Sequence, residues 1–163
     1  SSHAVCTKDI YFDQKEFFGG KTKEEAYGIY FDEMLKNIKV CKDFCVYGHL
    51  DFISRYGMYR DNSLSYKDFA DKIDAVLLAL IERGKGIEIN TSGFRYGINT
   101  AYPSIDILKR YKELGGEIIT IGSDAHFTKH VADHSKFAYD LLQEAGFNHI
   151  TVFRERKPQF IKL

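Results

Sequence analysis

The chain has 163 residues and a mass of 18.8 kDa, which is the size of one domain with a substantial hydrophobic core. Its 23 Lys and Arg residues balance 23 Asp and Glu residues, and a net charge of zero argues against a general electrostatic grip on nucleic acid or on an anionic membrane. No apolar run is long enough to span a bilayer, and three cysteines without a CxxC pair favour reduced thiols in a cytoplasmic protein.

Strands and helices alternate along the chain. In chain order we expect a strand fragment ending at His3, a helix at 22–40, a strand at 44–51, a helix at 65–84, a strand at 86–90, a helix at 102–116, a strand at 117–124, a helix at 129–146 and a strand at 149–153. Thr22 and Glu25 form a capping box at the start of the first helix, and Gly84 is a stop signal for the second. Pro103 suits the first turn of the third helix.

This alternation determines the expected fold class. Strand followed by helix, repeated four times, predicts an α/β protein with parallel strands and right-handed crossovers. The βα units form either part of a barrel or an open doubly wound sheet. No linker or low-complexity tract divides the chain, so residues 1–163 are expected to form one domain.

Polar residues gather where the expected strands end. In βα folds the chemistry lies at the carboxyl ends of the strands, and residues two apart on an extended backbone point the same way. The residues at these ends are His3, His49, Asp51, Glu88, Asn90, Asp124 and His126. Imidazole with carboxylate suits zinc, iron or manganese better than calcium or magnesium. We therefore expect a metal centre, with Asp51 orienting a ring nitrogen of His49.

Each of these residues also has a simpler interpretation. A single histidine at a strand end is more often solvated than bound to metal, and Glu88 on an apolar strand needs a partner in any case, which a buried Lys or Arg would supply. His130, His134 and His149 lie on or near the last helix and strand and are interpreted as surface or structural residues. The shared placement of the others favours a site, because independent loop histidines would scatter over both rims.

Two arginines in the loops after these strands are candidates for binding phosphate. Arg55 follows the strand that carries His49, and Arg95 follows the strand that carries Glu88. A guanidinium fork matches phosphate oxygens, and backbone N–H groups of the sequence TSG would add further donors. A phosphate ester is therefore the expected substrate, although an arginine on a solvated rim explains Arg95 equally well.

Four blocks of the sequence resemble a known family. They are SSHAV, YGHLDFISRYG, IEINTSGFRYG and YPSIDILKRYKELGGEIITIGSDAH. They resemble the polymerase and histidinol phosphatase (PHP) superfamily, and within it the bacterial histidinol-phosphate phosphatases. The resemblance implies part of a distorted, TIM-like (β/α)7 barrel with up to three zinc, iron or manganese ions. It also implies hydrolysis of L-histidinol phosphate to L-histidinol and phosphate in histidine biosynthesis.

The resemblance also implies roles for individual residues. It makes His3, His49, Asp124 and His126 metal ligands, with Asp124 and His126 also catalytic in proton transfer where they are not fully committed to metal. Arg55 matches a phosphate-binding position. Arg95 and Glu88 match family-typical residues, which we interpret as a second phosphate contact and, together with Asp51, as support for the ligands.

The chain also departs from the family. The family begins with a strand bearing a His-x-His pair, followed by a further histidine and a metal-bridging glutamate, and none of these is present. Residues 4–14 also lack the usual tryptophan-containing segment. We therefore expect a PHP domain that lacks its N-terminal strands, with that missing segment as its partner, a small phosphorylated substrate, and no nucleic acid or membrane. The alternatives are another PHP phosphoesterase or nuclease, or a catalytically incomplete PHP fragment.

Overall fold

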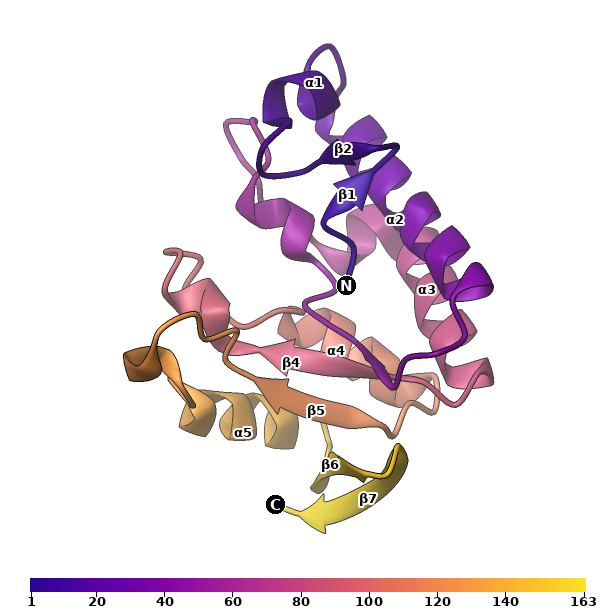
Figure 1. Cartoon of the computed structure of the whole chain (residues 1–163), viewed down its shortest axis with the longest axis vertical. Coiled ribbons are helices and arrows are strands. Elements are labelled where there is room, and N and C mark those ends of the chain that lie inside the picture. Colours follow the sequence, from indigo (N-terminus) through magenta and orange to yellow (C-terminus); the bar gives the residue numbers. More distant parts are fainter.

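The computed structural model describes residues 1–163, which form a mixed α/β fold with parallel strands (Figure 1). The helices are α1 (Gln14–Phe18), α2 (Lys23–Val40), α3 (Ala70–Glu82), α4 (Ile105–Glu113) and α5 (Ser135–Glu144). The strands are β1 (Ala4–Val5), β2 (Lys8–Asp9), β3 (Val46–Tyr47), β4 (Gly86–Asn90), β5 (Ile119–Gly122), β6 (His149–Arg154) and β7 (Lys157–Lys162). Short 3-10 helices lie at Phe52–Arg55, Tyr66–Phe69, Thr91–Phe94 and Thr128–His130.

The central sheet has the order β3-β4-β5, and all three strands are parallel, as the sequence predicted. Its register pairs Val46 with Gly86 and Ile87 with Ile119. The three strands form an open sheet, not a closed barrel. Because the strands are parallel, the loops that follow them meet at one rim, and this rim carries the polar residues described below.

The first and last strands differ from the sequence prediction. β1 pairs antiparallel with β2, and β6 pairs antiparallel with β7, so neither joins the parallel sheet. Both hairpins turn through two residues of positive φ, Cys6 and Thr7 in the first and Glu155 and Arg156 in the second. Such turns usually carry Asn-Gly or Asp-Gly, and the sequence shows neither here. That is why the hairpins were missed.

Helices α2 and α4 lie within the expected ranges, whereas α3 begins five residues later than expected, after the 3-10 helix Tyr66–Phe69, and α1 was not expected. In α2 the capping box is confirmed, with Thr22 Oγ1 accepting the N–H of Glu25 at 3.2 Å and the Glu25 side chain accepting the N–H of Thr22 at 2.9 Å. Helix α5 begins six residues later than expected, because residues 128–134 form a 3-10 turn and a loop. His134 there has a left-handed φ of 56° and stacks on Phe94 at 4.5 Å.

One hydrophobic core joins the elements, since 31 buried residues from Val5 to Phe147 form a single cluster. Figure 1 shows α2 and α3 side by side, α4 behind β4, α5 beside β5, and the two hairpins at opposite ends of the molecule. None of the helices combines the length and apolar character needed to cross a bilayer.

Candidate metal and phosphate site

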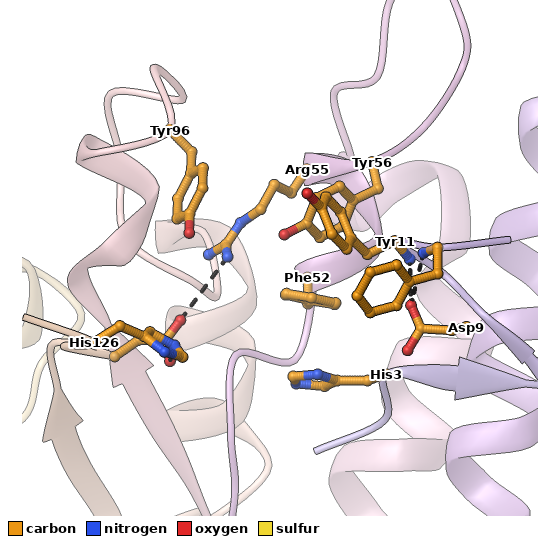
Figure 2. A pocket seen from close by; sticks show the side chains of 10 residues that line it. His3, Asp9, Tyr11, Phe52, Arg55, Tyr56, Tyr96 and His126 are labelled. Carbon is orange, nitrogen blue, oxygen red and sulfur yellow. Dashed lines mark hydrogen bonds and ion pairs between the residues drawn. The ribbon is translucent and has the colours of Figure 1, made fainter. Parts of the chain in front are cut away.

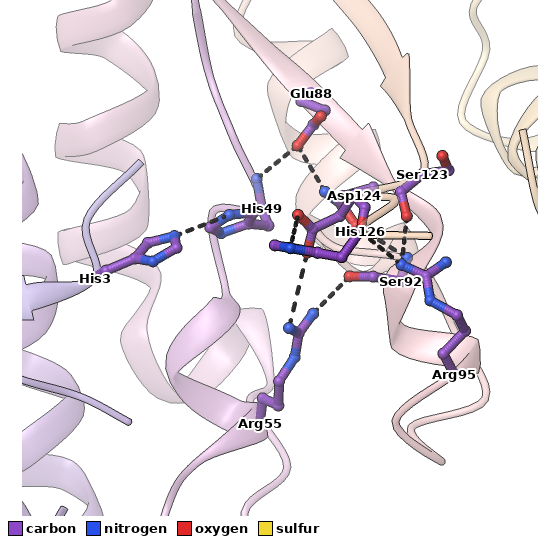
Figure 3. Close-up of polar contacts among 10 residues, drawn as sticks. His3, His49, Arg55, Glu88, Ser92, Arg95, Ser123, Asp124 and His126 are labelled. Carbon is purple, nitrogen blue, oxygen red and sulfur yellow. Dashed lines mark hydrogen bonds and ion pairs between the residues drawn. The ribbon is translucent and has the colours of Figure 1, made fainter. Parts of the chain in front are cut away.

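Two histidine rings from distant parts of the chain meet at the rim (Figure 3). His3 leads into β1 and His49 follows β3, and their Nε2 atoms lie 3.3 Å apart. Both rings pack against Phe52, with ring centroids 4.7 Å and 4.6 Å away. Burial, followed by the proximity of His3, lowers the pKa of His49 to about 4, and burial also lowers the pKa of His3. At neutral pH both rings are therefore uncharged, which is the form that binds metal.

Glu88 fixes the backbone that carries His49. Its Oε2 atom accepts the N–H of His49 at 3.2 Å and the side-chain N–H of Asn90 at 2.9 Å. Gly122 on β5 and Gly48 just after β3 leave room for the carboxylate, because a Cβ atom on Gly122 would lie 2.0 Å from Glu88 Oε1 and one on Gly48 would lie 3.2 Å from Oε2. The predicted supporting role of Glu88 thus has a concrete geometry, although its partners are a backbone and an amide, not a Lys or Arg.

Asp124 contacts both His126 and Arg55. It follows β5 with a left-handed φ of 49°, and its Oδ1 atom lies 3.5 Å from Nε2 of His126, whose side chain is 75% exposed. Its Oδ2 atom lies 3.9 Å from Nη1 of Arg55. Asp124 lines the same cavity as His3, and its negative charge opposes the lowering of the pKa of both His3 and His49.

Arg55 is held rigidly at the centre of the site. Its side chain is only 4% exposed, and Nη2 donates to Ser92 Oγ at 2.5 Å. The guanidinium carbon lies 3.9 Å from the ring centroid of Tyr96 and 5.1 Å from that of Tyr102. Stacking on aromatic rings keeps the planar fork in one orientation.

Arg95 and Asp51 both bond to backbone groups at the rim, and the predicted contact of Asp51 with His49 is absent. Arg95 donates from Nη2 to the backbone carbonyls of Ser123 at 2.5 Å and Asp124 at 2.9 Å, so it braces the loop that carries Asp124. Asp51 accepts the N–H of Ser104 at 3.0 Å and makes no hydrogen bond to His49, whose Nδ1 atom has no partner. Both side chains form hydrogen bonds with backbone groups, and the spacing of residues along a strand does not predict such bonds.

A cavity of about 560 Å³ lies in front of these residues (Figure 2). His3, Arg55, Asp124 and His126 line it together. The remaining lining residues were missed from the sequence, and they are Asp9, Tyr11, Phe12, Phe52, Tyr56 and Tyr96. The run of aromatic residues around an aspartate in DIYFD was the available signal, but it was not interpreted as part of a site.

The donor set fits a divalent metal ion only in part. Two imidazole Nε2 atoms face one another, a buried His49 nitrogen has no partner, and a carboxylate and a third imidazole lie nearby, which is a nitrogen and oxygen set that zinc, iron and manganese accept. No three His, Cys, Asp or Glu side chains of this chain are arranged to hold one ion. The structure therefore brings the His3–His49 pair and the Asp124–His126 pair to the same rim, and His3, Asp124 and His126 line one cavity there.

Together, the parallel sheet and this rim define an α/β domain with a histidine and carboxylate site at the carboxyl ends of its strands. The chain belongs to the PHP domain family, whose family model matches residues 1–92. The match covers His3, His49 and Glu88, whereas Asp124 and His126 lie beyond it. The expected membership of the PHP superfamily is thereby confirmed.

Curated relatives extend the similarity along the chain. The chain is 33% identical over 157 residues to a histidinol-phosphatase of Lactococcus lactis subsp. lactis (strain IL1403), covering 96% of this chain and 58% of the relative. It is 32% identical over 157 residues to a probable histidinol-phosphatase of Clostridium acetobutylicum, covering 96% of this chain and 60% of that protein. The chain thus spans about three-fifths of the length of the relatives that it matches.

Solved structures agree with the sequence comparison. A crystal structure of histidinol phosphate phosphatase from Lactococcus lactis, complexed with zinc, L-histidinol and phosphate, superposes with a TM-score of 0.81 at 30% identity, covering 96% of this chain and 59% of that one. A putative histidinol phosphatase from Listeria monocytogenes gives a TM-score of 0.66 at 20% identity, covering 80% of this chain and 52% of that one, which shows a shared fold.

Proposed function

We propose that this chain provides the phosphate-binding part and much of the metal centre of a histidinol-phosphate phosphatase, which hydrolyses L-histidinol phosphate to L-histidinol and phosphate. The observation that carries the proposal is the meeting of His3, Arg55, Asp124 and His126 at one cavity. The similarity to the Lactococcus lactis enzyme, solved with zinc, histidinol and phosphate, supports this choice among phosphoesterases.

The metal centre would use His3, His49, Asp124 and His126, and zinc, iron or manganese fits these donors. When bound, divalent cations offset the charge of the phosphate oxygens and lower the pKa of a water molecule. We propose that the remaining ligands come from a segment outside these 163 residues, which would also extend the open sheet toward a distorted (β/α)7 barrel. Two facts support this, namely the absence of a complete three-ligand group and the relatives' greater length.

Arg55 would hold the phosphate. Its Nε atom is buried without a hydrogen-bond partner, and its Nη1 atom makes only the 3.9 Å contact with Asp124, so donors remain for a ligand. Ser92 and the aromatic rings fix the fork in place before the substrate arrives. A preorganised cation of this kind stabilises the charge that develops on the phosphate oxygens. Arg95 would act indirectly, through the loop of Asp124.

The leaving alkoxide needs a proton when its bond to phosphorus breaks. His126 is the most exposed imidazole at the cavity, and Asp124 holds its ring at 3.5 Å. We propose that His126 donates the proton to that oxygen where its ring is not bound to metal, with Asp124 orienting it.

The organic half of the substrate would lie against the opposite wall of the cavity. Histidinol carries an ammonium group and an imidazole ring. Tyr11, Phe12 and Tyr56 supply aromatic faces, and Asp9 supplies a carboxylate. The Oδ1 atom of Asp9 accepts the N–H groups of Tyr11 at 2.8 Å and Phe12 at 2.9 Å, which fixes the carboxylate beside these rings. Carboxylate and aromatic faces together favour a cation.

We propose a cytoplasmic setting, which the free thiols support. Cys6, Cys41 and Cys45 are all free. Reduced cysteines suit the cytoplasm, where we place this step of histidine biosynthesis.

Phosphate release tests the proposal. The chain is loaded with zinc or manganese and assayed on L-histidinol phosphate, alone and with an added polypeptide that covers the amino-terminal part of the Lactococcus lactis relative. We expect release that rises when the added segment completes the metal centre, together with zinc binding by the chain alone. If histidinol phosphate is not hydrolysed in either arm while zinc is bound, the proposed activity is wrong and only the metal site survives.

A further inference from the structure

Asn90, the last residue of β4, lies between the metal ligands and the phosphate-binding arginine, and it is only 1% exposed. Its backbone N–H donates to the carbonyl of Tyr102 at 2.6 Å, and its own carbonyl accepts the N–H of Tyr102 at 2.8 Å. This mutual pairing joins the end of β4 to the segment that leads into α4. The amide side chain of Asn90 therefore leaves the strand from a backbone that is held on both sides.

One end of this amide supports the histidine half of the site. Nδ2 of Asn90 donates to Oε2 of Glu88 at 2.9 Å, and the same carboxylate oxygen accepts the backbone N–H of His49 at 3.2 Å. Asn90 is the one side chain that donates to Glu88. It therefore orients the carboxylate that holds the backbone of His49.

The other end of the amide supports the arginine half. Oδ1 of Asn90 accepts the backbone N–H of Ser92 at 2.9 Å, and Oγ of Ser92 accepts Nη2 of Arg55 at 2.5 Å. Tyr102, which pairs with the backbone of Asn90, has its ring centroid 5.1 Å from the guanidinium carbon of Arg55. In Figure 3 Glu88 lies on the His49 side of the site and Ser92 on the Arg55 side.

The two neighbours determine which end of the amide is which. A carboxylate only accepts hydrogen bonds and a backbone N–H only donates them, so the nitrogen must face Glu88 and the oxygen must face Ser92. Asparagine meets both demands at once. Aspartate in its place would turn an acceptor toward the Glu88 carboxylate, and alanine would leave both neighbours without their partner.

We propose that Asn90 is a positioning residue, which fixes the His49 metal ligand and the Arg55 guanidinium relative to each other. It acts through Glu88 on one side and through Ser92 on the other, without touching metal or substrate. A phosphate held by a metal ion and a guanidinium together tolerates little change in their separation. This inference rests on the proposed function, since it names the residue that joins the two halves of that site.

Three variants separate the two contacts. Asn90→Asp has the same shape, keeps the acceptor for Ser92 and loses the donor to Glu88. Ser92→Ala keeps the contact of Asn90 with Glu88 and loses the hydroxyl that binds Arg55. Asn90→Ala loses both contacts. The matched control is Asn148→Asp, at an exposed asparagine between α5 and β6.

Two binding constants are measured on the whole chain. Zinc titration reports on the histidine half, and calorimetric titration of the zinc-saturated chain with sulfate, a tetrahedral dianion that keeps zinc in solution, reports on the arginine half. We expect Asn90→Asp to raise the zinc Kd about tenfold and the sulfate Kd much less. Ser92→Ala should raise the sulfate Kd about tenfold and the zinc Kd much less. Asn90→Ala should raise both, and Asn148→Asp neither.

This split distinguishes positioning from stability alone, because a merely structural residue would lower the thermal midpoint without separating the two constants. If Asn90→Ala fails to fold, the opposite effects of Asn90→Asp and Ser92→Ala still decide. Wild-type constants in both Asn90 variants, or equal changes of both constants in every variant, overturn the inference. A wild-type chain that binds neither ion overturns it together with the site. Absence of histidinol phosphate hydrolysis with the split intact contradicts only the proposed activity.

Discussion

The Nε2 atoms of His3 and His49 face each other at 3.3 Å, although the two residues are 46 positions apart in the chain. One hydrogen at most fits between them, so the pair cannot bear two protons there. Burial, with His3 alongside, lowers the pKa of His49 to about 4, which keeps its ring neutral under ordinary conditions. Two neutral rings directed at one point are arranged to bind a cation better than they bind each other.

Replacing Arg55 with lysine tests the phosphate contact. Lysine keeps the positive charge but loses the planar fork that stacks on Tyr96 and donates to Ser92. In the completed enzyme we expect phosphate release to fall about 100-fold, the size of effect seen when one transition-state donor is removed. The control is Arg83→Lys at the end of α3, which should leave the rate unchanged. Equal rates for the two variants would remove Arg55 from the phosphate site.

The substitution Gly122→Ala tests the hydrogen bond by which Glu88 holds the backbone of His49. The new Cβ atom would lie 2.0 Å from Glu88 Oε1, so the carboxylate must leave the N–H of His49. We expect Gly122→Ala to weaken zinc binding and to lower the free energy of unfolding by about 1–3 kcal/mol. The matched variant Gly48→Ala places its Cβ atom 3.2 Å from Glu88 Oε2 and should have a smaller effect. Zinc titration and chemical denaturation measure both quantities, and a reversed order would contradict this role of Glu88.

The stability of the metal-free protein should depend on His49 in acid. The folded-state pKa of about 4 lies below the reference value of 6.5, so the unfolded chain binds the extra proton first. The contribution of the neutral ring is complete above pH 6.5 and is lost as the pH falls toward 4. His49→Gln should therefore lose less stability than the wild type across that range, by up to about 3 kcal/mol.

Asp51 gives the opposite slope, because burial raises its pKa to about 7. It is present in both the wild type and His49→Gln, so its effect cancels in the comparison. Denaturation in EDTA at several pH values measures the difference between the two proteins. Parallel stability curves would mean that the His49 ring is not held in its neutral form by the fold.

Asp9 should affect the choice of substrate more than the chemical step. Asp9→Asn removes the carboxylate that would bind the ammonium group of histidinol and leaves the phosphate side of the cavity intact. We expect KM for L-histidinol phosphate to rise about tenfold, the size of effect of losing one charge-assisted hydrogen bond, with kcat little changed. Hydrolysis of p-nitrophenyl phosphate, which has no ammonium group, should be unaffected. Equal losses on both substrates would assign Asp9 a structural role only.

The sequence predicted the parallel core well because its signals were local. The capping box of Thr22 and Glu25 and the left-handed Gly84 lie where they were expected, and the rim brings His3, Asp124 and His126 to one cavity. Tertiary contacts determined the rest. Asp51 accepts the N–H of Ser104, and Arg95 donates to the carbonyl groups of Ser123 and Asp124, and these contacts between distant parts of the chain are not visible in the sequence.

Zinc anomalous diffraction from crystals of the zinc-loaded chain tests the central claim most directly. We predict anomalous peaks within about 2.0–2.2 Å of the imidazole nitrogens of His3 and His49 and of the carboxylate of Asp124, the usual lengths for zinc bound to nitrogen and oxygen. Peaks only at Cys6, Cys41 or Cys45, or no zinc at this rim, would contradict a metal centre built from these residues.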